Sequence, residues 1–203
     1  MAAALWIAIY AGVLVWSAIA PRDFLTWLLE TLPAMVGAAV LAATYKRFRL
    51  TGLTYTLILI HAVILMVGGH YTYAEVPLFN HLGELFGWQR NNYDKLGHLA
   101  QGFVPAIIAR EILIRKAVIS TAAWRNFFIV CFCLALSAMY ELIEWATALV
   151  SQEAADAFLG TQGYVWDTQS DMAWALFGSI IALVLLGRMH DRQLAGLPTG
   201  QST

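Results

Sequence analysis

Residues 124–150 read WRNFFIVCFCLALSAMYELIEWATALV, an apolar stretch long enough to cross a bilayer as a helix. After Arg125, its only charged residues are Glu141 and Glu144. A segment in hydrocarbon must satisfy its own backbone hydrogen bonds, so this stretch predicts a transmembrane helix. Carboxyl groups inside such a helix are costly, so they also predict a functional site.

The rest of the 203-residue chain has the same character. It is 60% hydrophobic and 12% charged, with a mean hydropathy of +0.66, which excludes an ordinary soluble globule. Further apolar runs occupy residues 3–20, 25–45, 53–69, 93–114 and 168–187. The first run ends in small residues like a signal-peptidase site but lacks a basic region before it, so we interpret it as a span. We therefore expect an all-α polytopic membrane protein, with six transmembrane helices in one bundle.

The distribution of Lys and Arg predicts the orientation. Such residues accumulate on the cytoplasmic side of membrane proteins. With the N-terminus inside, the cytoplasmic ends hold Lys46, Arg47, Arg49, Arg110, Arg115, Lys116, Arg125, Arg188 and Arg192. Only Arg22, Arg90 and Lys95 fall outside. We expect an inner-membrane protein with both termini cytoplasmic, a single domain over residues 1–194, and a disordered cytoplasmic tail at 195–203.

Two outer connections are long enough to carry structure. In residues 76–90, apolar side chains recur at helical spacing after Pro77, which predicts an amphipathic helix lying in the membrane interface. It could serve as a lid or only cover the edge of the bundle. Residues 151–160 predict a second short helix, opened by a capping Ser and closed by Gly.

Composition excludes several kinds of partner and cofactor. The net charge is −1 and no basic block occurs, which argues against nucleic acid. The two cysteines, Cys131 and Cys133, lie two apart in one apolar run and point to different sides of a helix, so neither a disulfide framework nor a thiolate metal site is expected. Nothing in the chain indicates a nucleotide or redox cofactor.

Ionisable side chains inside the predicted spans form three pairs, each on one helix face. The pairs are Asp94 with His98, Glu141 with Glu144, and Asp167 with Asp171. Gln101 and Ser137 continue the first two stripes by one helical turn. In the predicted topology all three stripes fall in the outer half of the membrane, so we expect a single site on the periplasmic side.

The charges in this site need compensation. Five carboxylates would meet there, while the nearest cations, Arg90 and Lys95, are expected at its rim. Either a divalent metal is bound or several carboxyl groups carry protons. Nitrogen and carboxylate ligands suit Zn²⁺ or Mn²⁺ better than Mg²⁺.

The metal hypothesis assigns a role to each polar residue. The metal ligands would be His98, Glu141, Asp167 and Asp171. Glu144 would act as general base on water, Asp94 would orient His98 or join the ligands, and Glu141 could exchange roles with either. The residues expected to line the site are Gln101, His70, Tyr73, Ser137 and Arg90.

Structural roles remain open for the same residues. Asp94 and Asp167 could only stabilise helix N-termini. Glu141, Glu144 and Asp171 could hold helices together by hydrogen bonds, and His98 could be a satisfied core histidine. His70 and Tyr73 could equally be interfacial residues.

Several motifs carry a resemblance to a known family. They are HYTYAEVP at 70–77, RNNYDKLGH at 90–98, QG at 101–102, YELIEW at 140–145 and QGYVWDTQSDM at 162–172. With these motifs the chain resembles the YjdF-like family of bacterial inner-membrane proteins over nearly its whole length. More distantly, the order Asp-Lys-x-x-His, then Glu, then Asp before a Gly-containing last span resembles VanZ-like proteins, which are associated with glycopeptide resistance and the cell envelope. The resemblance implies a multi-spanning inner-membrane protein and supplies no reaction.

The site then favours one function and leaves others open. The favoured function is a metal-dependent hydrolase that acts on a lipid-linked or amphipathic envelope substrate among the membrane lipids. The alternatives are a proton- or cation-coupled carrier, a lipid-binding protein, and a non-catalytic envelope accessory protein. A carrier is less favoured because the chain has no internal repeat and no polar stripe is expected in the cytoplasmic half of the spans.

Overall fold

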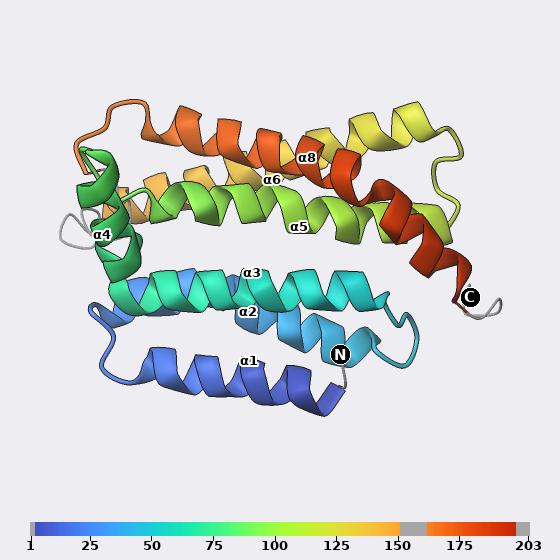
Figure 1. The fold of residues 1–203 in the computed structure, drawn as a ribbon, viewed down its shortest axis with the longest axis horizontal. Coiled ribbons are helices and arrows are strands. Elements are labelled where there is room, and N and C mark those ends of the chain that lie inside the picture. Colours follow the sequence, from blue (N-terminus) through green and yellow to red (C-terminus); the bar gives the residue numbers. More distant parts are fainter. Residues whose placement is uncertain (1–2, 151–161, 198–203) are drawn as a thin grey trace.

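The computed structural model describes residues 3–150 and 162–197, and over these residues the chain is helical without strands (Figure 1). The long helices are α1 (Ala3–Ala18), α2 (Phe24–Thr44), α3 (Gly52–Tyr71), α5 (Tyr93–Arg115), α6 (Ala122–Val150) and α8 (Asp167–Ala195). They run along the long axis of one bundle, and the direction alternates from each to the next. The short helices η1 (Tyr73–Glu75) and α4 (Pro77–Phe86) lie at one end of the bundle, which we call the α4 end.

Each predicted span corresponds to one of these long helices, so the all-α prediction is confirmed. Among the described residues, four helices are long and apolar enough to cross a membrane: α2, α3, α6 and α8. Helix α1 has only 16 residues, and α5 carries charged side chains near both of its ends. Six crossings therefore stay a prediction.

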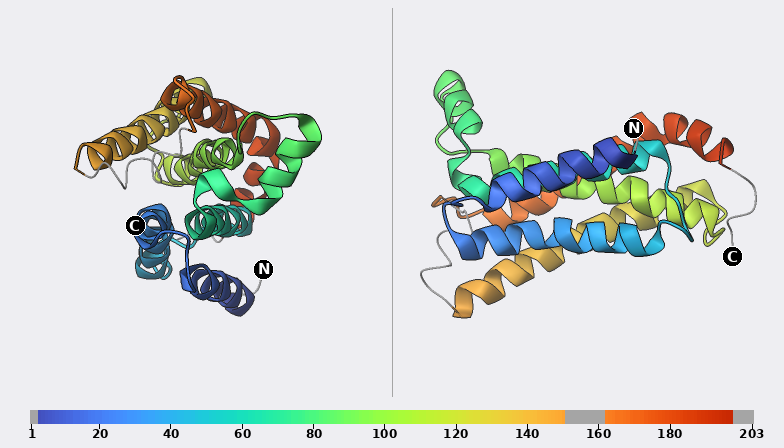
Figure 2. Two further views of the ribbon diagram at one scale, coloured as in Figure 1. Left: turned by 90° about the vertical axis from the view of Figure 1, so that its left-hand side faces the viewer. Right: turned by 90° about the horizontal axis from the view of Figure 1, so that it is seen from below.

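Helix α5 can carry charged residues because it lies inside the bundle. It packs against α3, α6, α8 and η1, and the view from the α4 end shows it enclosed by its neighbours (Figure 2). Its polar residues therefore face other helices rather than lipid, which is where charged groups in a membrane protein are tolerated. This position makes α5 the element on which the polar site is built.

Glycines bring α5 and α8 into close contact. A Cβ atom added at Gly102 would collide with the carbonyl group of Ala175, and one added at Gly178 would collide with the carbonyl group of Leu99. Small residues at helix interfaces let the two backbones approach each other in this way. The first turns of α5 and α8 are consequently held side by side at the α4 end.

The helix predicted after Pro77 is present as α4; it begins at Pro77 and ends at Phe86, and Gly87 follows it in a left-handed conformation with φ +68°. It stands at a steep angle to the long helices and extends past the edge of the bundle (Figure 2), and Leu78, Leu85 and Phe86 on it are exposed. The short helix expected at 151–160 lies outside the described residues, as does the tail from residue 198 onward. Helix α8 continues past the predicted end of its span, to Ala195.

The apolar core of the long helices contains no disulfide among the described residues. Cys133 is buried in it beside Ile107 and Ile129, whereas Cys131 is exposed. Both thiols are free, as expected from their spacing.

Candidate functional site

His98 is the centre of a buried polar cluster at the α4 end. Its Nε2 atom lies 3.3 Å from Oδ1 of Asp94, 3.6 Å from Oε1 of Glu141 and 4.0 Å from Oδ2 of Asp171. These carboxyl groups come from α5, α6 and α8 respectively. The three polar stripes read from the sequence therefore meet at one imidazole ring, which is itself buried.

Gln101 determines how the imidazole faces the carboxylates. Nδ1 of His98 lies 3.0 Å from Oε1 of Gln101, one turn further along α5. With the amide oxygen as acceptor, Nδ1 carries a proton and donates to it. Nε2 then faces three carboxylates. It either carries a second proton, so that the imidazole is charged, or presents a free lone pair. The second arrangement is the usual one for a histidine that binds a metal.

Glu141 and Glu144 form the α6 side of the cluster, and both are buried. Over the described residues, Oε1 of Glu141 has no hydrogen-bond partner although it is buried. An unsatisfied buried acceptor costs free energy, so its position requires an explanation.

Two overlapping groups of potential metal ligands share His98. One consists of Asp94, His98 and Asp171, and the other of His98, Glu141 and Glu144. Within each group the potential ligand atoms lie within 4.8 Å of one another. Nitrogen and oxygen donors at this separation fit one divalent ion, or two ions that share ligands.

Lys95 and Arg90 enter the cluster, which corrects the expectation that they lie at its rim. Nζ of Lys95 lies 2.7 Å from Oδ1 of Asp171 and 3.3 Å from Oδ1 of Asp167. Arg90 lies 2.5 Å from the same oxygen of Asp167. Both basic side chains are only 12% exposed, because they fold inward against the ring of Tyr164. Asp167 is thus held by two cations and is less suited to metal binding than the other carboxylates.

Glu30 is a sixth acidic residue of the site and was not among the predicted site residues. It lies on α2 and is buried, and the Tyr140 hydroxyl donates a 2.9 Å hydrogen bond to its Oε2 atom. The missed signal was the one that identified the others, an acidic residue inside an apolar span. Tyr140 directly precedes Glu141 in YELIEW and carried no separate signal.

Tyr73, one of the predicted lining residues, lies in η1 and is buried next to Glu30. Its ring is close to Gly68 and Gly97, where a Cβ atom would collide with it, and its side chain hydrogen-bonds Glu30. Burial raises the pKa of the Tyr73 phenol, so the hydroxyl group stays protonated. Tyr73 therefore serves as a neutral donor to a buried carboxyl group.

The other predicted lining residues differ in position. Ser137 is fully buried one turn deeper than Glu141, and its Oγ atom has no hydrogen-bond partner among the described residues. His70 instead faces α1, where its ring lies 4.5 Å from that of Trp16 and its Nδ1 atom is 3.1 Å from the carbonyl oxygen of Ser17. We therefore assign His70 to helix packing.

The acidic groups outnumber the cations in this cluster. The acidic residues are Glu30, Asp94, Glu141, Glu144, Asp167 and Asp171, and the permanent cations are Arg90 and Lys95. Even with His98 protonated, the remaining carboxyl groups need protons or a metal ion. The two basic residues therefore compensate only part of the negative charge that the sequence places in this site.

A second buried polar cluster lies at the opposite end of the bundle. Glu111 of α5 accepts a 2.7 Å hydrogen bond from Thr54 and lies 3.2 Å from Nε2 of His190 on α8. Arg110 contacts the other ring nitrogen of His190. The expectation that no polar stripe occurs in this half of the spans is wrong, because α8 extends far enough to bring His190 to Glu111.

Comparison with known proteins also indicates a membrane protein. The family described as "Predicted membrane protein (DUF2238)" matches residues 2–192. The chain is 52% identical to the Escherichia coli (strain K12) protein named "Inner membrane protein YjdF" over 190 residues, which cover 93% of this chain and 91% of the relative. No solved structure matches the chain. The chain therefore belongs to the DUF2238 family of predicted membrane proteins, with an inner-membrane protein as its relative.

Proposed function

We propose that the cluster around His98 binds a divalent metal and that the protein is a metal-dependent hydrolase. The observation that carries the proposal is the Glu141 carboxylate. Its Oε1 atom is buried without a hydrogen-bond partner among the described residues and faces Nε2 of His98 at 3.6 Å. A metal ion coordinated by both atoms would satisfy the orphaned acceptor and compensate part of the negative charge.

The contacts divide the roles among the side chains. His98, Glu141, Asp94 and Asp171 would hold the metal, with His98 oriented by Gln101. Glu144 lies in the same group of donors and would serve as general base. Asp167 stays with Arg90 and Lys95 and positions these cations. A bound Zn²⁺ or Mn²⁺ would supply an activated water molecule for hydrolysis.

The surroundings of the site support a lipid-linked or amphipathic substrate. Helix α4, which carries exposed apolar side chains, lies at the same end of the bundle as the first turns of α5 and α8, at a place suited to the membrane interface. A lipid-linked or amphipathic substrate would bring its polar part to His98 while its apolar part stays in lipid. We further propose six crossings, cytoplasmic termini and a periplasmic α4 end, because the basic residues concentrate at the opposite end.

A proton- or cation-coupled carrier is the second candidate, and one observation favours it. Buried polar groups occur at both ends of the bundle, and Ser137 and His61 between them each carry a buried atom without a hydrogen-bond partner among the described residues. Buried chains of ionisable groups are typical of proton relays. A role as an envelope accessory protein and the distant VanZ-like resemblance stay predictions.

The metal content of the full-length protein, purified in detergent, tests the proposal. After incubation with Zn²⁺ or Mn²⁺ and desalting, elemental mass spectrometry should find stoichiometric metal in the wild type. Glu141→Gln and Asp171→Asn should lose it. Glu75→Gln is the matched control, because Glu75 forms a half-exposed ion pair with Arg22 outside the cluster. A wild type that retains no metal, or retention in both cluster variants, would contradict the metal site.

The hydrolase assignment has its own test. Metal-loaded protein is incubated with a total lipid extract of bacterial membranes, and the lipid classes are followed by mass spectrometry. We expect one lipid-linked class to decrease with the wild type and to persist with Glu144→Gln. If the protein binds metal but alters no lipid class, the hydrolase is excluded and the carrier is favoured.

A further inference from the structure

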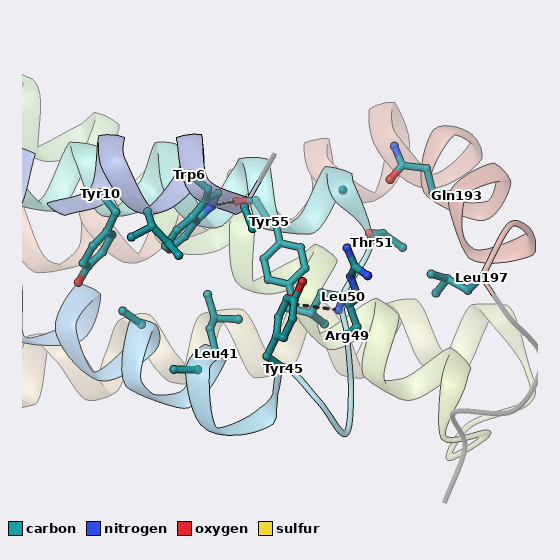
Figure 3. Close-up of a pocket in the computed structure, with 15 residues that line it drawn as sticks. Trp6, Tyr10, Leu41, Tyr45, Arg49, Leu50, Thr51, Tyr55, Gln193 and Leu197 are labelled. Atoms are coloured by element: carbon teal, nitrogen blue, oxygen red, sulfur yellow. Dashed lines mark hydrogen bonds between the residues drawn. The ribbon is translucent and has the colours of Figure 1, made fainter. Parts of the chain in front are cut away.

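We propose a second ligand site at the opposite end of the bundle, where a pocket between α1 and α2 binds an acyl chain of an anionic phospholipid. The pocket has a volume of about 850 Å³, within the range of known ligand sites. Its walls come from the first half of α1, the second half of α2 and the start of α3 (Figure 3). It shares no residue with the cluster around His98.

The pocket exists because α1 and α2 each pack on α3 rather than closely on each other. A Cβ atom added at Gly12 of α1 or at Gly37 of α2 would meet nothing within 4 Å. Between them, the hydroxyl group of Tyr10 donates a 3.1 Å hydrogen bond to the carbonyl oxygen of Ala34. This hydrogen bond joins α1 and α2 at the end of the pocket nearest Tyr10. The other end, beside Arg49, stays open.

The walls present an apolar surface although they contain aromatic side chains with polar atoms. Nε1 of Trp6 donates a 2.8 Å hydrogen bond to the carbonyl oxygen of Tyr55, and the Tyr55 hydroxyl accepts one from the backbone N–H of Leu50. These polar atoms are therefore satisfied within the protein, and the rings remain to contact a ligand (Figure 3). Such a surface suits a hydrocarbon chain.

The mouth of the pocket is basic. Arg49 lines it, with its guanidinium group over the Tyr45 ring at 5.4 Å. Lys46 and Arg47 lie in the same connection between α2 and α3. Among the described residues, no carboxylate forms an ion pair with any of these three cations. A ligand with an apolar chain and an anionic head fits both parts of the site, and membranes supply it as an anionic phospholipid.

Native mass spectrometry of the full-length protein tests the headgroup. The protein in detergent is titrated with phosphatidylglycerol, and with phosphatidylcholine of the same acyl chains. We expect tighter binding of phosphatidylglycerol, and about fivefold weaker binding after Arg49→Gln, because a cation near an anionic lipid contributes about 1 kcal/mol. Arg22→Gln is the matched control, since Arg22 forms an exposed ion pair with Glu75 and does not line the pocket. Equal affinity for the two lipids, or equal effects of the two variants, would overturn the proposal.

A second pair of variants tests the chain-binding part. Ala38 lines the pocket and Ala39, its neighbour on α2, does not. Ala38→Phe should fill the space and abolish saturable lipid binding, whereas Ala39→Phe should leave it unchanged. Thermal unfolding is measured alongside, and if Ala38→Phe does not fold, the Arg49 comparison decides. Unchanged binding in folded Ala38→Phe, or equal retention of a free fatty acid, would refute a phospholipid site.

Discussion

Two buried carboxylates, Glu111 and Glu141, differ in what surrounds them. Glu111 is fully buried and accepts hydrogen bonds from the backbone and hydroxyl groups of Thr51, from Thr54 and from Arg115. Oε1 of Glu141 has no such donor among the described residues. A carboxylate whose lone pairs are used stabilises the fold, whereas one left open is available to a ligand. This contrast supports a structural role for Glu111 and the proposed ligand-binding role for Glu141.

This contrast predicts opposite effects on stability. Glu111→Gln replaces an acceptor oxygen by an amide NH2 group that faces hydrogen-bond donors. It also leaves Arg115 and His190 without their carboxylate. We expect the free energy of unfolding to fall by about 3–5 kcal/mol, the usual cost of breaking a buried ion pair. Glu141→Gln replaces a buried carboxyl group whose Oε1 atom has no hydrogen-bond partner among the described residues, and should leave the thermal midpoint unchanged or raise it.

Thermal unfolding in detergent, followed by intrinsic fluorescence, measures both effects. Asp191→Asn is the control at the same end of the bundle, because Asp191 pairs with Arg110 but is mostly exposed, and such pairs contribute little. If Glu111→Gln melts like Asp191→Asn, the structural role of Glu111 is refuted.

The sequence reveals some site residues and not others for a physical reason. Asp94 and His98 share a helix face at a spacing of four, which follows from helix geometry alone. The inward turn of Arg90 and Lys95 depends on Asp167, more than seventy residues away in the sequence. Contacts of this kind depend on tertiary packing, which one sequence does not specify.

At the scale of elements, the contact between α5 and α8 positions the site. Gly102 and Gly178 allow the backbones to touch, and this contact places Asp171 opposite His98. Helix periodicity predicted both helices, but it did not show which pair packs closely. That choice depends on small residues facing each other, and they can be recognised only once both helices are placed.

Gly178→Val should separate α8 from α5. The new side chain meets the carbonyl group of Leu99, which cannot move without distorting α5. Overpacking usually lowers the free energy of unfolding by about 1–3 kcal/mol. We expect a loss near the upper end of this range, because the clash is with backbone rather than with a side chain. We expect a lower thermal midpoint together with weaker metal retention, because Asp171 moves with α8.

Gly187→Val provides the control for helix propensity. A Cβ atom at Gly187 meets nothing within 4 Å. Because Gly187 lies in the same helix, Gly187→Val changes the helix propensity of α8 by the same amount as Gly178→Val. The Gly187→Val variant should retain the metal and unfold at nearly the same thermal midpoint as the wild type. Equal losses in the two variants would show that the contact with α5 does not position the site.

At the scale of the molecule, apolar runs predicted the number and order of the long helices because each run must form its own hydrogen bonds in hydrocarbon. They did not reveal that α5 is enclosed by other helices, which explains why its hydropathy is low despite its length. Alternation of the long helices places the start of α1 and the end of α8 at the same end of the bundle (Figure 1). The basic connections lie at that end as well, including residues 46–49 between α2 and α3.

This arrangement predicts which side of the membrane each connection faces, and single cysteines measure it in a variant with Cys131 and Cys133 replaced by Ser. A membrane-impermeant maleimide should label Glu84→Cys in intact spheroplasts, because α4 faces the periplasm in the proposed orientation. Lys46→Cys and Val118→Cys should react only after permeabilisation, because their connections lie at the basic end.

Since α5 separates Glu84 from Val118, equal labelling of these two sites in intact spheroplasts would show that α5 does not cross the membrane. Labelling of both Lys46→Cys and Val118→Cys, but not of Glu84→Cys, in intact spheroplasts would show that the orientation is reversed and would place the His98 cluster on the cytoplasmic side.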